Sequence, residues 1–98
     1  EEKLIFDRLQ RRGVPFETID DRKVVFDLQG NGFAGYDVVL ERCINHSRAL
    51  YALHILNDWG VPTVNNAEVA EVCGNKLLTS SALIRHAVPT PRTKIAFT

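Results

Sequence analysis

Apolar residues recur at helical spacing near the start of the chain. Leu4, Ile5 and Leu9 repeat at the spacing that places them on one face of a helix, and most residues around them are charged or amide side chains. Gly13 follows this pattern, and glycine readily adopts the left-handed conformation in which many helices end. The sequence therefore predicts an amphipathic helix that ends at Gly13.

Three β-rich runs come next. Residues 14–20 alternate loosely, and residues 23–28 are rich in β-forming side chains before the turn-forming residues 29–32. Residues 36–40 form a short and largely apolar run, which is typical of a strand covered on both faces in a parallel sheet. We expect strands in these three runs.

A helix with a broad apolar side is predicted over residues 47–58. Ser47 can act as its N-cap, because a serine hydroxyl can accept a bond from a free backbone N–H at the start of a helix. Trp59 and Gly60 end the helix. Residues 61–64, with β-branched side chains at three of the four positions, predict another strand.

Two further helices are separated by a glycine. Asn66 can cap the first, which we expect to run through Val72 until Gly74 interrupts it. The second covers residues 76–86, and the prolines that follow break the helical pattern. Residues 93–98 predict a final strand.

The order of these elements indicates the fold class. Strands that alternate with helices across short turns predict an α/β fold with a mainly parallel sheet. In such a fold the first helix normally follows a central strand, whereas this sequence opens with a helix. We therefore expect that the natural protein has an opening strand before Glu1.

Composition and charge narrow the class of protein. A chain of 98 residues that is 45% hydrophobic can build one core. Its 12 Lys and Arg balance 12 Asp and Glu, so no excess of positive charge favours a nucleic-acid partner. No apolar run approaches the roughly 20 residues that cross a bilayer. Cys43 and Cys73 lack the spacing of a metal or redox motif, which predicts reduced thiols in a cytoplasmic protein.

Polar residues gather in a loop at residues 41–48, after the third predicted strand. In α/β folds, ligands bind outside the carboxyl ends of the strands. Arg42 or Arg48 could bind a carboxylate there through two parallel hydrogen bonds, close to the free N–H groups of a helix start. The alternative is a structural role, in which Ser47 caps the helix, Glu41 pairs with Arg42 and the rest of the loop is solvated.

Lys76 stands at the first position of a predicted helix. The helix dipole favours anions at that end, so a lysine there is electrostatically out of place unless it meets a ligand such as phosphate. The alternative is that Asn75 is a simple N-cap and Lys76 a surface residue. The sequence has no glycine-rich phosphate loop, which argues against this domain holding a whole nucleotide by itself.

The histidines give weak signals. His54 and His86 lack metal-ligand spacing to another histidine, cysteine or carboxylate, and His46 is either a ligand contact or a hydrogen-bonding residue of the polar loop. Cys43 and His46 share that loop, but no third group that would orient them can be identified. We predict neither a metal site nor a catalytic residue within this chain.

Five segments together resemble the amino-terminal region of LysX-type ligases, which are RimK-like ATP-grasp enzymes. The segments are residues 37–42, 45–50, 60–65, 73–76 and 88–93. The resemblance implies a pre-ATP-grasp domain, a three-layer αβα Rossmann-like fold, over residues 1–88. Residues 89–98 are then a connecting strand that leads into two ATP-grasp lobes. The resemblance also accounts for the missing opening strand.

The resemblance implies a reaction as well. Ligases of this family transfer the γ-phosphoryl group of ATP to a carboxylate, and an amine then attacks the acyl phosphate to form an amide. In the LysX-like branch, which serves lysine and arginine biosynthesis, the carboxylate is the terminal glutamate of a small acidic amino-group carrier protein. The amine belongs to α-aminoadipate or glutamate. ATP and Mg²⁺ are therefore implied, bound mainly by the lobes, together with a homo-oligomeric enzyme in which this part alone is inactive.

The resemblance also assigns residues. Lys76 matches the family lysine that reaches the ATP phosphates from this domain, although Asn75 stands where an aspartate is common. The loop that faces the acceptor is matched by Arg42, Asn45, His46, Ser47 and Arg48. Two alternatives stay open: a RimK-type ligase that adds glutamate to a protein tail, and a Rossmann-like binding module without catalysis.

Overall fold

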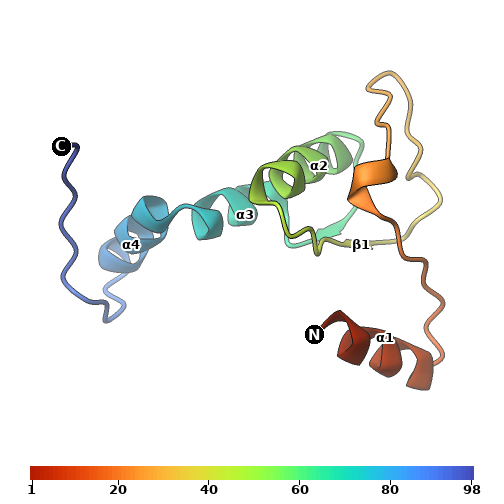
Figure 1. Cartoon of the computed structure of the whole chain (residues 1–98), viewed down its shortest axis with the longest axis horizontal. Coiled ribbons are helices and arrows are strands. Elements are labelled where there is room, and N and C mark those ends of the chain that lie inside the picture. Colours follow the sequence, from red (N-terminus) through yellow and green to blue (C-terminus); the bar gives the residue numbers. More distant parts are fainter.

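The computed structural model describes residues 1–98 and has an open, elongated shape (Figure 1). It extends over 44 × 36 × 23 Å with a radius of gyration of 16.7 Å, where a compact domain of this length has about 13 Å. Its accessible surface is 8275 Å², compared with about 5,600 Å² for a compact monomer of this mass. Much apolar surface is therefore left uncovered.

The first helix, α1, spans Glu2–Arg11 and confirms the prediction. Two residues after the helix stands Gly13, whose φ of 65° is left-handed. The Gly13 N–H donates to the carbonyl of Gln10, and the Val14 N–H donates to the carbonyl of Leu9, both at 3.0 Å. This pair of bonds satisfies carbonyls that the helix itself leaves free.

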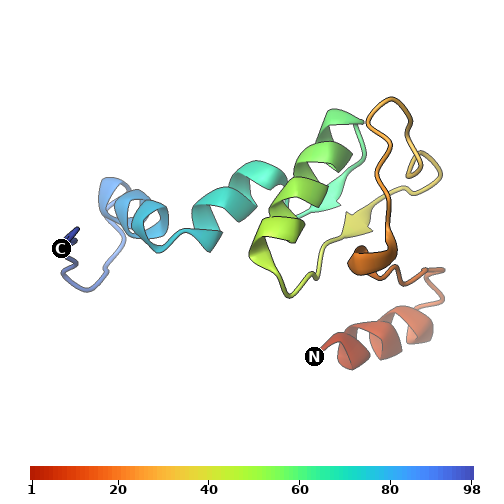
Figure 2. The same ribbon diagram turned by 45° about the horizontal axis from the view of Figure 1, so that its top comes forward.

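The centre of the molecule is a strand–helix–strand unit. Strands β1 (Val39–Leu40) and β2 (Thr63–Val64) form a parallel pair. The helix α2 (His46–Asp58) connects them and packs against β2 and against α3 (Ala67–Gly74), as Figure 2 shows. The predicted α/β class with a parallel sheet is confirmed, in a sheet of two short strands. The three-layer arrangement stays a prediction.

The core lies between α2 and the elements that follow it. Five residues are buried: Ala49, Leu53, Leu56, Val61 and Ala67. Leu53 is fully buried, and every other member of the core comes from α2, from the approach to β2 or from the start of α3. Burial of apolar surface here holds α3 against α2.

Asn57 adds polar contacts at the end of α2. Its Nδ2 donates to Thr63 Oγ1 at 2.8 Å, and its Oδ1 accepts from the backbone N–H of Ala67 at 2.9 Å. One side chain therefore links α2, β2 and the first residue of α3. The start of α3 is capped separately by Asn66, which accepts from the N–H of Val69 at 2.8 Å, as predicted.

Four aromatic rings fix the loop before β1 against the end of α2. Phe33 lies 5.7 Å from Phe26, 5.5 Å from Tyr36 and 6.5 Å from Trp59, measured between ring centroids. Phe26 also lies 6.0 Å from Trp59. Residues 23–28 were predicted as a strand, but they form none because Phe26 packs on these rings and no strand runs beside it.

Two other predicted strands are absent. Residues 14–20 form no strand, and the 3-10 helix η1 (Asp21–Lys23) follows them, with the Asp20 side chain accepting from the Arg22 N–H. Residues 93–98 also form none. A strand needs a neighbouring strand for its backbone hydrogen bonds, and neither segment has one.

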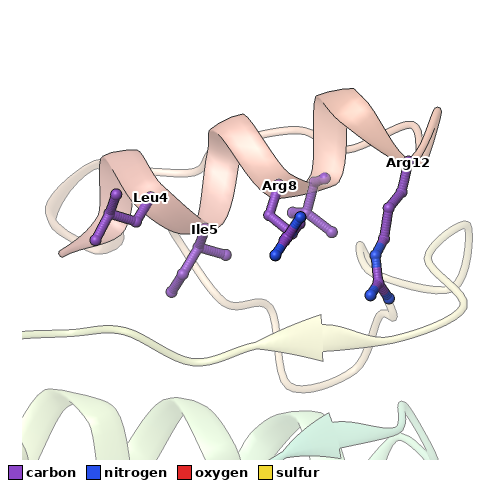
Figure 3. Close-up of a pocket in the computed structure, with 5 residues that line it drawn as sticks. Leu4, Ile5, Arg8 and Arg12 are labelled. Atoms are coloured by element: carbon purple, nitrogen blue, oxygen red, sulfur yellow. The ribbon is translucent and has the colours of Figure 1, made fainter.

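One edge of the sheet is open. β1 pairs only with β2, so its other edge has no partner strand. Figure 3 shows side chains of α1 pointing to the side of the helix on which β1 lies. They line a shallow hollow of about 320 Å³ and belong to Leu4, Ile5, Arg8, Leu9 and Arg12. Leu4 is 73% exposed, so the apolar face of α1 has space for a further element beside β1.

The last helix, α4, spans Lys76–Arg85 and packs against α3. Two residues after the helix stands Ala87, which has a left-handed φ of 54°. The Val88 N–H donates to Leu83 and the Ala87 N–H to Ile84, which is the same pattern as at the end of α1. None of the helices combines the length and the apolar character needed to span a bilayer.

Candidate functional site

The predicted acceptor loop joins β1 to α2. Asn45 is the N-cap of α2, and its Oδ1 accepts from the Arg48 N–H at 3.0 Å. Ser47 lies within the first turn and is exposed. The prediction that Ser47 caps this helix is therefore wrong. Asn45 has the extended backbone of an N-cap, with φ −85° and ψ 114°, while the helix already begins at His46.

Arg42 connects this loop to α1. Its Nη2 donates to Glu2 Oε1 at 2.9 Å and lies 3.6 Å from Glu1 Oε2. The pKa of Glu2 is lowered, first by its own backbone N–H and then by Arg42. The alternative pairing of Arg42 with Glu41 is not formed, because the Glu41 side chain accepts from the backbone N–H of Cys43.

Arg48 connects the same loop to η1. Its Nε lies 2.7 Å from Asp21 Oδ2. That oxygen is buried and has no hydrogen-bond partner of good geometry, so the contact is an ion pair of close charges. Beside it, Arg22 donates two side-chain bonds to Asp20, both at 2.9 Å, and lowers the pKa of Asp20 to about 2.

These charges line one polar hollow of about 250 Å³. Its walls include Arg22, Arg42 and Arg48 together with Asp20 and Asp21. Three guanidinium groups at one place can bind a small anion such as a carboxylate, provided that it competes with the carboxylates already paired there. The sequence analysis missed the contribution of η1. Its only signal in the sequence is a run of four charged residues, Asp20 to Lys23, which begins at the end of the predicted strand 14–20.

Cys43 also lines this hollow. Burial, and then a hydrogen bond with Glu41, raise the pKa of its thiol to about 12. The thiol is therefore protonated at neutral pH, and this is the opposite of what a nucleophilic cysteine requires.

His46 lies on another side of the loop. A Cβ added to Gly74 would overlap its imidazole ring, so the ring lies directly against the end of α3. Figure 2 shows the start of α2 beside the end of α3. The residues predicted as one loop site are thus divided: Arg42 and Arg48 line the polar hollow, and His46 contacts the junction of α3 and α4.

Lys76 is the first residue of α4 and is exposed. The preceding Asn75 is the N-cap, and its Oδ1 accepts from Leu77 N at 3.0 Å and Leu78 N at 3.2 Å. Lys76 itself forms no ion pair. Thr79 secures the junction, because its Oγ1 donates to the carbonyl of Val72 at 2.7 Å. The ammonium group is thus available to an anion from outside this chain.

The structure has no group of three or more His, Cys, Asp or Glu residues placed to hold a metal ion. The candidate site therefore consists of the ion pairs of the loop after β1, the capped start of α4 and the exposed Lys76. Residues 1–72 match the family model described as the LysX preATP-grasp domain.

The chain belongs to the LysX preATP-grasp domain family. The match covers α1, the β1–α2–β2 unit and most of α3. Relatives of this LysX preATP-grasp domain include the glutamate–LysW ligase ArgX of Sulfurisphaera tokodaii, which is 36% identical over 98% of the chain and 34% of the relative. Another is the α-aminoadipate–LysW ligase LysX of Saccharolobus solfataricus, which is 33% identical over 99% of the chain and 36% of the relative. The chain spans about a third of the length of these relatives.

Proposed function

We propose that this chain is the acceptor-side domain of an ATP-dependent ligase that joins an amino acid to a LysW-type carrier protein. The observation that carries the proposal is the similarity to LysW ligases along nearly the whole chain, together with the family match over residues 1–72. Relatives named for glutamate and for α-aminoadipate are similarly close, so the amino acid is one of these two.

The proposed reaction has two steps. A carboxylate oxygen of the carrier attacks the γ-phosphorus of ATP, and ADP leaves. The amine of the amino acid then attacks the acyl carbon, so that phosphate leaves with the acyl C–O bond broken and the amine loses a proton. Each step develops negative charge on phosphate oxygens, which positively charged groups stabilise.

We assign Lys76 to those phosphate oxygens. Three features support this role: the ammonium is exposed, it has no competing carboxylate, and it stands at a helix start where a cation gains nothing from the dipole. Asn75 in place of an aspartate leaves Lys76 without a preceding ion-pair partner.

We assign the loop that contains Arg42 and Arg48 to the acceptor. The loop follows the carboxyl end of β1, where α/β domains bind their ligands. Both guanidinium groups are about half exposed, with 46% and 50% of the side chain accessible. The Arg42–Glu2 pair is exposed on both sides, and exposed ion pairs are weak, so an incoming carboxylate can replace Glu2 as the partner of Arg42. At Arg48 it would have to compete with Asp21, which is less exposed.

Mg²⁺ does not fit the residues of this chain alone, since no cluster of acidic side chains or histidines could hold it. We therefore place its ligands in the ATP-grasp lobes of the longer ligase and derive no step from it here. The uncovered apolar surface of the chain fits the same proposal, because residues 89–98 and the faces of α1 and α4 would be covered by other parts of a larger three-layer domain and its lobes.

Intact-mass spectrometry of the carrier protein tests the proposal. The full ligase is incubated with a LysW-type carrier, ATP, Mg²⁺ and either glutamate or α-aminoadipate. We expect the carrier to gain the mass of one amino-acid residue, with ADP formed in equal amount. A carrier that lacks its terminal glutamate is the matched control and should gain nothing.

Other outcomes separate the alternatives. A gain on an unrelated protein tail, with none on the carrier, would favour a RimK-type ligase. Absence of ATP turnover with each acceptor would favour a binding module without catalysis.

A further inference from the structure

His46 and Gly74 make a contact that joins the two halves of the proposed site. The three atoms closest to a Cβ built on Gly74 are all in the His46 imidazole: Cε1, Nε2 and Nδ1, with Nδ1 at 2.6 Å and the other two nearer. A contact below about 3 Å is not tolerated by real Cβ atoms. The ring therefore occupies the space that any other residue at position 74 would need.

Glycine is not required at this position by its backbone. The glycines with left-handed φ are Gly13 and Gly60, and Gly74 is not among them. Gly74 is the last residue of α3, where alanine has the better helix propensity. The role of Gly74 is thus to leave space for the His46 ring.

The contact lies immediately before the proposed phosphate lysine. After Gly74 the chain leaves the helix at Asn75, with φ −110° and ψ 111°, and Lys76 begins α4. Thr79 braces this junction from within α4 through its bond to the Val72 carbonyl. His46 braces it from the start of α2. Two contacts are therefore made at the residues just before Lys76, one from α2 and one from the first turn of α4.

We propose that His46 is a positioning residue for Lys76, acting through its contact with Gly74. The inference rests on the proposed function, in which Lys76 meets the ATP phosphates. His46 is in the first turn of α2, and Arg48 follows in the same turn. One helical turn therefore carries both Arg48, which is assigned to the acceptor, and His46, which contacts the residues before Lys76. A shared turn would hold the carrier carboxylate and the ATP phosphates in a fixed relative position.

The test uses Gly74→Ala, His46→Ala and the double variant in the full ligase. His46 is exposed, so its ring can swing into solvent when a methyl group takes its place. Gly74→Ala should then keep or raise the melting temperature, because alanine favours the helix. It should nevertheless raise the KM for ATP by roughly 3- to 10-fold, the size of coupling between neighbouring residues. His46→Ala should raise the KM for ATP by a similar factor. The KM of the double variant should be no higher than that of either single variant.

Two further readouts keep this test separate from the proposed function. Hydrogen exchange of residues 75–79 should become faster in both single variants without a fall in melting temperature, whether or not the enzyme ligates amino acids. His46→Phe keeps a planar ring at the contact and should restore both exchange and the KM for ATP. Additive effects of the two substitutions, or faster exchange with an unchanged KM for ATP, would overturn the positioning role. Loss of ATP dependence in the unmodified ligase would instead overturn the proposed function and leave the exchange result standing.

Discussion

Arg48 and Asp21 join the start of α2 to the turn η1, with Nε and Oδ2 2.7 Å apart. Arg48 could bind the acceptor or only hold the loop in place through this ion pair. Substituting each partner in turn distinguishes the two roles. Arg48→Ala removes the guanidinium, whereas Asp21→Asn removes only the ion pair.

We expect Arg48→Ala to raise the KM for the carrier protein by about 10- to 100-fold, which corresponds to one charge-assisted hydrogen bond of about 1.5–3 kcal/mol. Asp21→Asn should change this KM by less than about threefold. Arg48→Ala should lower the free energy of unfolding by about 1–3 kcal/mol, because it leaves the buried Asp21 Oδ2 without a positive charge beside it. Asp21→Asn should lower it by less than about 1 kcal/mol, since half of the Arg48 side chain is exposed to water. Steady-state kinetics with the carrier varied, with melting curves alongside, measure this. Equal effects of the two variants on the KM would give Arg48 a purely structural role.

Cys43 and Cys73 should differ in reactivity. Burial raises the pKa of Cys43 to about 12, so almost none of it is thiolate at pH 8, whereas Cys73 is exposed. Iodoacetamide at pH 8 should alkylate Cys73 first, as peptide mass spectrometry can show. Since the folded pKa of Cys43 is raised, its contribution to stability is complete below the ordinary thiol pKa and is lost as the pH rises toward 12. Equal alkylation rates of the two thiols at pH 8 would contradict this.

Asn57 should matter more to stability than its neighbour on α2. Asn57→Ala leaves the part-buried N–H of Ala67 without its acceptor and the Thr63 hydroxyl without its donor. We expect a loss of about 1–3 kcal/mol in the free energy of unfolding. Asp58→Ala, at an exposed position without an ion pair, is the matched control and should change it by less than about 0.5 kcal/mol. Equilibrium unfolding in denaturant measures the change in stability of both variants, and hydrogen exchange of α2, β2 and α3 shows where it occurs. If Asp58→Ala lowered the free energy of unfolding as much as Asn57→Ala, the hydrogen bonds of Asn57 would have no special role in stability.

Ala87 adopts a backbone conformation that favours glycine, with φ 54°. A left-handed alanine costs about 1 kcal/mol, so Ala87→Gly should stabilise the end of α4 by up to about that amount. Gly60→Ala, at the equivalent position after α2 with φ 76°, should destabilise by a similar amount. The melting temperatures of the two variants should therefore move in opposite directions. A fall with Ala87→Gly would contradict this explanation.

Local signals in the sequence predicted most ends of the helices to within two residues, although α3 continues through Gly74, where the prediction ended it at Val72. Gly13 and Gly60 end α1 and α2, and Asn66 and Asn75 cap α3 and α4, because a cap depends on a few neighbouring residues. The one wrong cap, Ser47, failed because Asn45 two residues earlier offers an acceptor at an extended backbone position.

Contacts between distant segments could not be predicted in this way. Residues 14–20 and 93–98 have the composition of strands, but a strand forms only where another strand lies beside it. The pairing of Arg48 with Asp21 and the packing of His46 on Gly74 likewise depend on how far-apart elements meet. The loop after β1 and the lysine of α4 are candidates that the sequence alone predicts, and their roles stay predictions, whereas the contacts of η1 and of the α3–α4 junction required the structure.

The central claim, that Lys76 meets the phosphates of ATP in the proposed ligase, is tested most directly by measuring the rate of Lys76→Ala at varied ATP concentration. Lys76 is exposed and unpaired, so its loss should leave the melting temperature unchanged. Loss of one charge-assisted phosphate contact, about 1.5–3 kcal/mol, should raise the KM for ATP or lower turnover by about 10- to 100-fold. Lys3→Ala, at an exposed position on α1 without an ion pair, is the control and should leave ATP kinetics unchanged. Unchanged ATP kinetics in Lys76→Ala, with the carrier protein saturating, would contradict the account.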